Sequence, residues 1–507
     1  MLAAVTTATL LGVQGQRVTV EALVSGGLPA FQMVGLPDEA CRESRDRVRA
    51  AVLSSELPWP TGRVVVNLAP SDQRKGGAGL DLAIAIALLV AQGSIPTEAV
   101  EGLGFVGELG LDGSLRPVAG VAPMVAAMGD AQPVVAMASF VEASIVATGR
   151  VRVARSLREV VDGLRADEPW PHPPDDVAAT DDDEPMADLG DVRGQLVARR
   201  ALEVAAAGGH HLLLVGPPGS GKTMLAQRLV GLLPDLDPRQ SLETTLVHSA
   251  AGIRLPAQGL VRRPPLRAPH HSSSMAALVG GGSQALRPGQ ISLATNGVLF
   301  LDELGEFGPA VLDALRQPLE EGVVRVARAR ASAVLPARFL LVAATNPCPC
   351  GGGAPGACEC DDGARLRYVR RLSGPLLDRF DMRVGVQRPG VDELLSTEHA
   401  EATTIVAARV AAARAASRRR NGGVLNAALS GAALDEVAPL ADAAQRMLRV
   451  ELEAGRLTGR GYHRVRRVAR TLADLAGELD LVVDEPHVAL ALQLRVRLGV
   501  SSRRSAP

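Results

Sequence analysis

The chain has 507 residues, 47% of them hydrophobic and 21% charged, with a formal net charge of −1 at pH 7. This length exceeds what one hydrophobic core usually supports, so we expect two to four domains, and the near-zero charge excludes a uniformly polycationic nucleic-acid binder. No apolar run approaches the roughly 18 residues of a membrane helix, and the first ten residues lack the positive start of a signal peptide. These features predict a cytoplasmic protein with no membrane partner.

Residues 1–164 alternate between strand and helix patterns, which predicts an α/β or α+β domain. Strands are expected from the first residues onward and at 18–24, 63–68 and 102–109, and an apolar helix is expected at 80–90. Residues 165–189 combine several prolines with the acidic run Asp181-Asp-Asp-Glu184. Such stretches stay extended or disordered, so we place an acidic, proline-rich linker there.

Residues 190–394 predict a doubly wound α/β core. A helix at 192–207 precedes a strand at 212–215, a glycine-rich turn and a helix at 224–233, and buried strands recur at 297–301 and 339–344. Residues 395–507 are rich in Ala, Arg and Leu with helical periodicity. This segment predicts an all-helical C-terminal lid.

A phosphate-binding loop is the strongest motif in the sequence. It matches G-x-x-x-x-G-K-[ST] between an apolar strand and a helix, and its residues are Gly216, Pro217, Pro218, Gly219, Ser220, Gly221, Lys222 and Thr223. The glycines let backbone N–H groups surround phosphates, and the helix N-terminus favours negative charge. Lys222 is one of only two lysines in the chain, and we expect it to reach the β- and γ-phosphates of ATP while Thr223 binds Mg²⁺.

Two buried strands of the predicted core end in polar residues with possible catalytic roles. Asp302 and Glu303 follow the first strand, so we expect Asp302 to hold Mg²⁺ and Glu303 to activate the attacking water as general base. Asn346 ends the second strand, where its amide can orient the same water. The alternative for Asn346 is a turn-forming role before Pro347.

Arg379 lies near the end of the predicted core, between two acidic residues. An arginine supplied by a neighbouring subunit can neutralise charge in the transition state of phosphoryl transfer. The alternative is a surface salt bridge with Asp378 or Asp381, and the residues alone favour that alternative.

Four of the five cysteines lie between residues 348 and 360, namely Cys348, Cys350, Cys358 and Cys360. A disulfide framework would spread cysteines along the chain, whereas four clustered thiolates can converge tetrahedrally on Zn²⁺. The C-x-C spacing is tighter than the usual C-x₂-C, and reduced or redox-labile thiols are the alternative. We predict a structural zinc site rather than a catalytic one.

Several strings along the chain resemble those of the Mg-chelatase-like AAA+ ATPases of the ComM/YifB family. They are Gly35-Leu-Pro-Asp-Glu-Ala40, Leu266-Arg-Ala-Pro-His-His271, Gly280-Gly-Gly282, Ile291-Ser-Leu-Ala294, Asn296-Gly-Val-Leu-Phe-Leu-Asp-Glu-Leu304, Asn346-Pro-Cys-Pro-Cys-Gly351 and Val468-Ala-Arg-Thr-Leu-Ala-Asp474. The resemblance implies an ATP-driven motor that forms a ring, expected to be hexameric. It further implies branch migration or helicase action on single-stranded or branched DNA during recombination and natural transformation. The rival is a chelatase-type or chaperone-type ATPase that remodels a protein partner.

The resemblance also assigns roles to arginines. It implies that Arg379 is the finger, and that a lid arginine contacts the γ-phosphate, with Arg460 favoured and Arg464 as the alternative. Residues 323–334 alternate like a hairpin, with Arg328 and Arg330 at its tip. In related ring helicases such hairpins point into the central channel, so the two arginines are the predicted DNA contacts. The alternative is a solvated, charged hairpin tip.

The resemblance assigns residues 248–290 to an insert in the second core helix. This segment carries His270 and His271, but two adjacent histidines without a third nearby ligand rarely bind a metal. The N-terminal unit resembles the Lon-protease-type domain, in which a Ser-Lys pair does the chemistry. The serine position falls on Gly77, and no lysine occurs at 119–124. We therefore predict a non-proteolytic platform that binds DNA or supports ring assembly.

Overall fold

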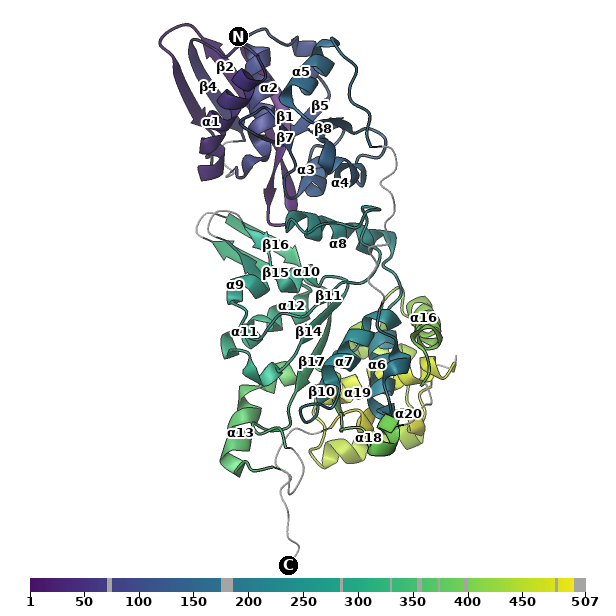
Figure 1. The fold of residues 1–507 in the computed structure, drawn as a ribbon. Helices are drawn as coiled ribbons and strands as arrows, with labels where there is room; N and C mark the ends of the chain where they lie inside the picture. Colours follow the sequence, from purple (N-terminus) through teal and green to yellow (C-terminus); the bar gives the residue numbers. More distant parts are fainter. Residues whose placement is uncertain are drawn as a thin grey trace, which may run out of the picture.

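The structure is a computed structural model, and it describes residues 1–70, 75–174, 186–282, 286–328, 331–352, 358–372, 374–395, 400–478 and 482–496. An N-terminal sheet domain lies over a core with a parallel sheet, and a helical region flanks that core (Figure 1). This arrangement confirms the predicted mixed α/β class with a helical C-terminal region. The likeness of the N-terminal domain to Lon-type proteases stays a prediction.

The N-terminal domain is built on a seven-stranded sheet with the order β3-β4-β2-β1-β5-β8-β9. Its strands are β1 (Leu2–Leu11), β2 (Gln14–Ser25), β3 (Ala30–Val34), β4 (Arg63–Ala69), β5 (Leu103–Val106), β8 (Gln132–Ala136) and β9 (Arg152–Ala154). Its helices are α1 (Glu39–Ser54), α2 (Asp81–Ala91), α3 (Val121–Ala127), α4 (Phe140–Ser144) and α5 (Leu157–Arg165). Every residue of α2 is buried, because the sheet covers one side of this helix and α1 covers another. That burial explains why the helix predicted at 80–90 is apolar all round.

The core sheet has five parallel strands in the order β11-β14-β17-β10-β18. They are β10 (Leu212–Val215), β11 (Leu266–Arg267), β14 (Val298–Leu301), β17 (Leu340–Thr345) and β18 (Met382–Gly385). All residues of β10, β14 and β17 are buried, as expected for a parallel sheet covered on both faces. Because the strands are parallel, the residues that follow them emerge at one edge, which positions the candidate site.

Three expectations about the core need correction. The helix predicted at 192–207 is α6 (Leu196–Gly208), because Gln195 takes a left-handed backbone with φ of 55° and begins the helix later. The helix predicted at 224–233 is α7 (Lys222–Arg228), followed by a separate 3₁₀ turn at Val230–Leu232. The segment 248–290 is not wholly an insert, because β11 within it pairs in parallel with β14 as an edge strand of the core sheet.

The helical region packs onto the core rather than forming a separate body. Its helices are α16 (Thr403–Arg420), α17 (Gly431–Val437), α18 (Asp442–Glu453), α19 (Gly459–Leu475) and α20 (Glu485–Gln493). Val410 of α16 and Val468 of α19 share one buried cluster with Leu202 of α6 and Leu214 of β10. Among the described residues, no helix combines the length and the hydropathy that a membrane crossing needs.

The N-terminal domain contacts the core through helices α3 and α4 and through the turn between β1 and β2. Helix α3 packs against α8 (Pro238–Ala250), and Ser249 on α8 donates a hydrogen bond to Glu142 on α4. The turn between β1 and β2 reaches the hairpin of β15 (Val323–Arg328) and β16 (Ala331–Pro336) (Figure 1). There Val13 packs against the cluster that contains Leu335, so this turn covers the base of the hairpin.

Candidate nucleotide-binding and catalytic site

The loop between β10 and α7 has the backbone that phosphate binding requires. Gly219 and Gly221 have φ of 73° and 85°, a region in which residues with a Cβ are strained. A Cβ on Gly216 would lie 2.1 Å from the carbonyl oxygen of Val386, so the loop can pass β18 only with glycine there. The loop ends at the N-terminus of α7, where free N–H groups face outward.

Lys222 is held at the centre of this loop. Its Nζ donates hydrogen bonds to the carbonyl oxygens of Gly216 at 2.8 Å and Pro217 at 2.9 Å, and it lies 3.4 Å from Oδ1 of Asn346. Burial lowers the pKa of Lys222, and the nearby carboxylates of Asp302 and Glu303 act in the opposite direction. The ammonium group therefore lies between the loop and the ends of β14 and β17, where the β- and γ-phosphates of ATP are expected.

The structure brings the two predicted magnesium ligands together. Thr223 Oγ1 donates a 2.6 Å hydrogen bond to Oδ2 of Asp302, and Oδ1 of Asp302 accepts a 2.9 Å bond from the backbone N–H of Glu303. A hydroxyl and a carboxylate are oxygen donors that suit Mg²⁺. The donor set therefore fits a Mg²⁺ ion bound with the phosphates, and the ion would supply charge neutralisation there.

These groups enclose a cavity of about 470 Å³ beside the loop. Its described lining consists of Pro218, Gly219, Ser220, Gly221, Lys222, Thr223, Met224, Asp302, Glu303, Thr345 and Asn346. The predicted roles of Asn346 and Glu303 thus have the geometry they need, since both border the space next to Lys222. Whether they act on water stays a prediction.

Two residues that sequence reasoning missed also contact the loop. The Nε2 of Gln195 donates a 3.3 Å hydrogen bond to the carbonyl oxygen of Ser220, and the Nε of Arg388 donates a 3.2 Å bond to that of Pro218. Both residues steady the loop from other parts of the chain. No spacing pattern around the motif predicts these two residues. The left-handed turn at Gln195 and the path of the chain after β18 bring their side chains to the loop.

The edge of the core sheet opposite to the phosphate-binding loop holds Arg379, Arg460 and Arg464, the arginines predicted to contact the nucleotide. Asp381 precedes β18 and accepts a 3.1 Å hydrogen bond from the backbone N–H of His211, which precedes β10. Arg464 on α19 lies 3.2 Å from Asp381. A strand of four residues spans about 13 Å, so Arg464 lies far from the phosphate-binding loop of its own chain.

Arg379 lies in the same arginine group. Its pKa is lowered by burial and then by the nearby guanidinium groups of Arg460, Arg464 and Arg316. Arg379 forms an ion pair with Glu320 on α12 (Arg316–Glu321), so the salt bridge of the alternative is present, but its acidic partner is Glu320 and not Asp378 or Asp381. Neither Arg460 nor Arg464 lines the cavity beside Lys222. Their contact with the γ-phosphate stays a prediction.

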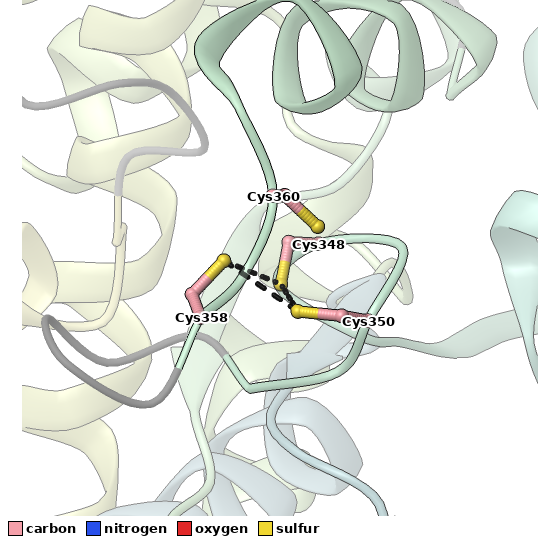
Figure 2. Close-up of side chains that lie close together, drawn as sticks. All are labelled: Cys348, Cys350, Cys358 and Cys360. Atoms are coloured by element: carbon pink, nitrogen blue, oxygen red, sulfur yellow. Dashed lines mark hydrogen bonds between the residues drawn. The ribbon is translucent and has the colours of Figure 1, made fainter.

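The four clustered cysteines converge, as the zinc prediction requires (Figure 2). Their sulfur atoms all lie within 4.8 Å of one another, and Sγ of Cys348 is 3.3 Å from that of Cys350 and 3.4 Å from that of Cys358. Four sulfurs at the usual 2.3 Å from Zn²⁺ would be about 3.8 Å apart. The four cysteines, including Cys360, therefore fit a tetrahedral zinc ion with small adjustments.

The cysteine loop also touches the phosphate-binding loop. Gly351 has φ of 78°, and a Cβ there would lie 2.7 Å from Cδ of Pro218. The cysteine loop starts two residues after Asn346. A bound zinc would therefore stiffen the segment that connects Asn346 with the wall of the nucleotide cavity.

The first prediction separates binding from hydrolysis. We expect Lys222→Ala to weaken ATP binding by at least ~10-fold, because it removes the charge between the phosphates. Glu303→Gln should keep ATP affinity and lower kcat by about 100-fold, since an amide cannot accept the proton. Fluorescent-nucleotide titration and phosphate release measure the two effects, with the exposed Glu306→Gln as control. A normal rate for Glu303→Gln would disprove its role as general base.

The second prediction concerns the cysteines. Freshly reduced protein should contain one zinc per chain by metal analysis. Cys358→Ser should release the metal and lower the melting temperature by roughly 5 °C or more, because a structural zinc stabilises only the folded state. Glu359→Gln, between two of the ligands, is the matched control and should change neither quantity. Protein without zinc at full stability would contradict the assignment.

Models of the magnesium chelatase subunit ChlI match three stretches of the chain. They cover residues 20–138 as subunit ChlI of Mg-chelatase, 188–394 as magnesium chelatase subunit ChlI, and 400–495 as the ChlI C-terminal region. A protein of Mycobacterium tuberculosis is 47% identical over 96% of both chains, and competence protein ComM of Haemophilus influenzae is 42% identical over 99% of both. A probable DNA helicase MCM9 of Arabidopsis thaliana is 26% identical over 40% of this chain and 25% of its own. These matches confirm the predicted resemblance, and the chain belongs to the Mg-chelatase-like AAA+ ATPases of the ComM/YifB family.

Proposed function

We propose that the protein is an ATP-driven DNA motor that assembles as a closed ring, expected to be a hexamer. It would drive branch migration or helicase action on single-stranded or branched DNA in recombination and natural transformation. The relative from Haemophilus influenzae is named a competence protein, and the partial match from Arabidopsis thaliana is named a probable DNA helicase. The helicase name supports DNA as the substrate, and the competence name supports a role in natural transformation.

The proposal of a ring is supported by the distance between two parts of the proposed catalytic machinery, the nucleotide cavity and the arginine group. Transfer of the γ-phosphoryl group needs positive charge around its equatorial oxygens. The described lining of the nucleotide cavity contains Lys222 and no arginine, whereas Arg379, Arg460 and Arg464 gather at the opposite edge of the sheet. A head-to-tail contact between chains would place the arginine group of one chain at the cavity of the next. Repeating that contact with a rotation that closes on itself gives a ring.

The β15–β16 hairpin is the proposed link between hydrolysis and DNA. It lies in the chain between β14, which leads to Asp302 and Glu303, and β17, which leads to Asn346. Val324, Val326 and Leu335 of the hairpin share a buried cluster with Leu301 and Leu304, which flank the two carboxylates. Motion at the γ-phosphate can therefore reach the hairpin through packed side chains. The described residues include the backbone of Arg328 but not its side chain, and Arg330 lies outside them, so their contact with DNA stays a prediction.

The second candidate function is the remodelling of a protein partner. It is favoured by the matched models, all of which describe chelatase subunits. The ATPase rate with and without single-stranded, duplex and branched DNA separates the two candidates. Stimulation by DNA supports the motor, and a rate that ignores all three DNA forms favours a protein substrate.

The third prediction tests the shared site by mixing two inactive variants. Lys222→Ala lacks a working nucleotide loop, and Arg379→Ala lacks the arginine that serves the next chain, so each alone should lose most of its activity. In mixed rings, an Arg379→Ala chain binds ATP next to a Lys222→Ala chain that still supplies Arg379. About a quarter of the interfaces should then be intact, which should restore a measurable fraction of the ATPase rate. Mixtures no more active than the separate variants would contradict a shared site.

The fourth prediction concerns the hairpin tip. Replacing Arg328 and Arg330 by Ala should lower DNA-stimulated ATPase and strand displacement by about 10-fold, because arginines hold phosphates without reading sequence. The salt dependence of DNA binding should become shallower by about two charges. Basal ATPase should persist. Arg325→Ala is the matched control, since Arg325 lies on the same hairpin but pairs with Glu321 at 3.2 Å. Normal strand displacement by the double variant would show that DNA is held elsewhere.

A further inference from the structure

The catalytic carboxylate Glu303 has a partner that its own strand does not provide. Nδ1 of His271 lies 3.2 Å from Oε2 of Glu303. The histidine side chain is 33% exposed and the glutamate side chain 57% exposed, so the pair is at the surface of the site and not in the hydrophobic core. Within the described part of the chain, the second carboxylate oxygen, Oε1, makes no hydrogen bond or ion pair.

The sheet itself brings His271 to this position. Strand β11 runs parallel to β14, with Leu266 opposite Val298 and Arg267 opposite Leu299. Residues that follow β11 therefore leave the sheet at the same edge as the residues that follow β14. The short stretch Ala268-Pro-His270 then carries His271 alongside Glu303.

Aromatic contacts fix the imidazole ring in this place. The centroids of the His270 and His271 rings are 4.1 Å apart, and the ring of Phe307 meets that of His271 edge-on with centroids 6.4 Å apart. His270 in turn pairs with the hydroxyl of Ser272 at 2.7 Å. A ring held on two sides has few alternative rotamers, so its Nδ1 stays close to Oε2 of Glu303.

The backbone of Glu303 is in a strained region, as is common at functional sites. Its φ and ψ are 51° and 50°, the left-handed conformation that residues with a Cβ seldom adopt. Glu303 also borders two cavities: the nucleotide cavity with Lys222, and one of about 290 Å³ lined by Thr223, Gln227, Asp302, His270 and His271. Its carboxylate could therefore turn toward either space unless one oxygen is held.

We propose that His271 is a positioning residue for Glu303, which rests on the proposed role of Glu303 as general base. The 3.2 Å contact between Nδ1 of His271 and Oε2 restrains the carboxylate, which leaves Oε1 to accept a proton from the attacking water. As that proton moves to Oε1, the water oxygen bonds to the γ-phosphorus, the bond to the β,γ-bridging oxygen breaks, and ADP and phosphate leave. Fixing a base through a third group is the arrangement that makes proton transfer efficient.

The test compares variants of the two histidines in the full-length protein. His271→Ala should lower kcat by about 10-fold at unchanged ATP affinity, because it removes orientation and leaves the phosphate contacts intact. His271→Gln should recover part of the loss, since its amide can donate the same hydrogen bond. His270→Ala should lower kcat by less than His271→Ala, because it removes one of the two rings that hold His271 but leaves the His271 side chain itself in place.

A double-mutant cycle shows whether His271 acts through Glu303. In single-turnover assays with Mg-ATP, His271→Ala should add almost no further loss to Glu303→Gln, because the group that it positions is already disabled. An equal loss in both backgrounds would assign His271 an independent role and overturn the proposal. So would a kcat for His271→Ala at or above that of the natural protein. If His271→Ala does not fold, His271→Gln against His271→Leu makes the same comparison, with and without a donor.

The experiments distinguish a failure of the His271 proposal from a failure of the proposal that Glu303 is the general base. A normal rate for Glu303→Gln would remove the general base and, with it, the group that His271 positions. An inactive Glu303→Gln beside an unaffected His271→Ala would overturn only the positioning role.

Discussion

Parallel pairing of five strands is the constraint on which the site depends. Hydrogen bonds between β11, β14, β17 and β10 align their carboxyl ends, and each strand then delivers one element of the machinery. The sequence after β10 surrounds phosphate, that after β14 supplies Asp302 and Glu303, and that after β17 supplies Asn346. Strand β11 brings His271 to the same edge. Because all residues of β10, β14 and β17 are buried, a shift in register would place polar groups in the core.

The same sheet separates the charges of the catalytic machinery. The amino ends of its strands carry Asp381 and the arginine group around Arg379, where burial and mutual repulsion lower the pKa of that guanidinium. Grouped cations are costly, and the ion pairs of Arg379 with Glu320 and of Arg464 with Asp381 offset part of that cost. In the proposed ring, a neighbouring chain with bound ATP would offer negative charge to this group. Assembly and nucleotide binding are thus expected to reinforce each other.

Two attachments connect the nucleotide cavity with more distant parts of the molecule. The cysteine loop leaves β17 just after Asn346 and rests on Pro218, so a metal there would stabilise both sides of the cavity. The β15–β16 hairpin leaves the region on the other side, and the turn of the N-terminal domain at Val13 packs against its base. Motion of the hairpin can therefore reach the N-terminal domain through this packing. The domain resembles Lon-type proteases, but Gly77 stands at the serine position and provides no nucleophile.

The sequence by itself determined the parts of this protein that depend on local chemistry. The sequence predicted the phosphate-binding loop with its glycines and Lys222, the carboxylates after β14 and the convergence of the four cysteines. Each of these patterns lies within a short stretch of chain. The tertiary structure alone decided which distant groups meet. It showed that Arg464 pairs with Asp381, away from its own nucleotide loop, that Gln195 and Arg388 support that loop, and that His271 lies beside Glu303. These contacts join residues from tens to about 170 positions apart in the chain. They arise from strand order and burial, which no short sequence pattern encodes.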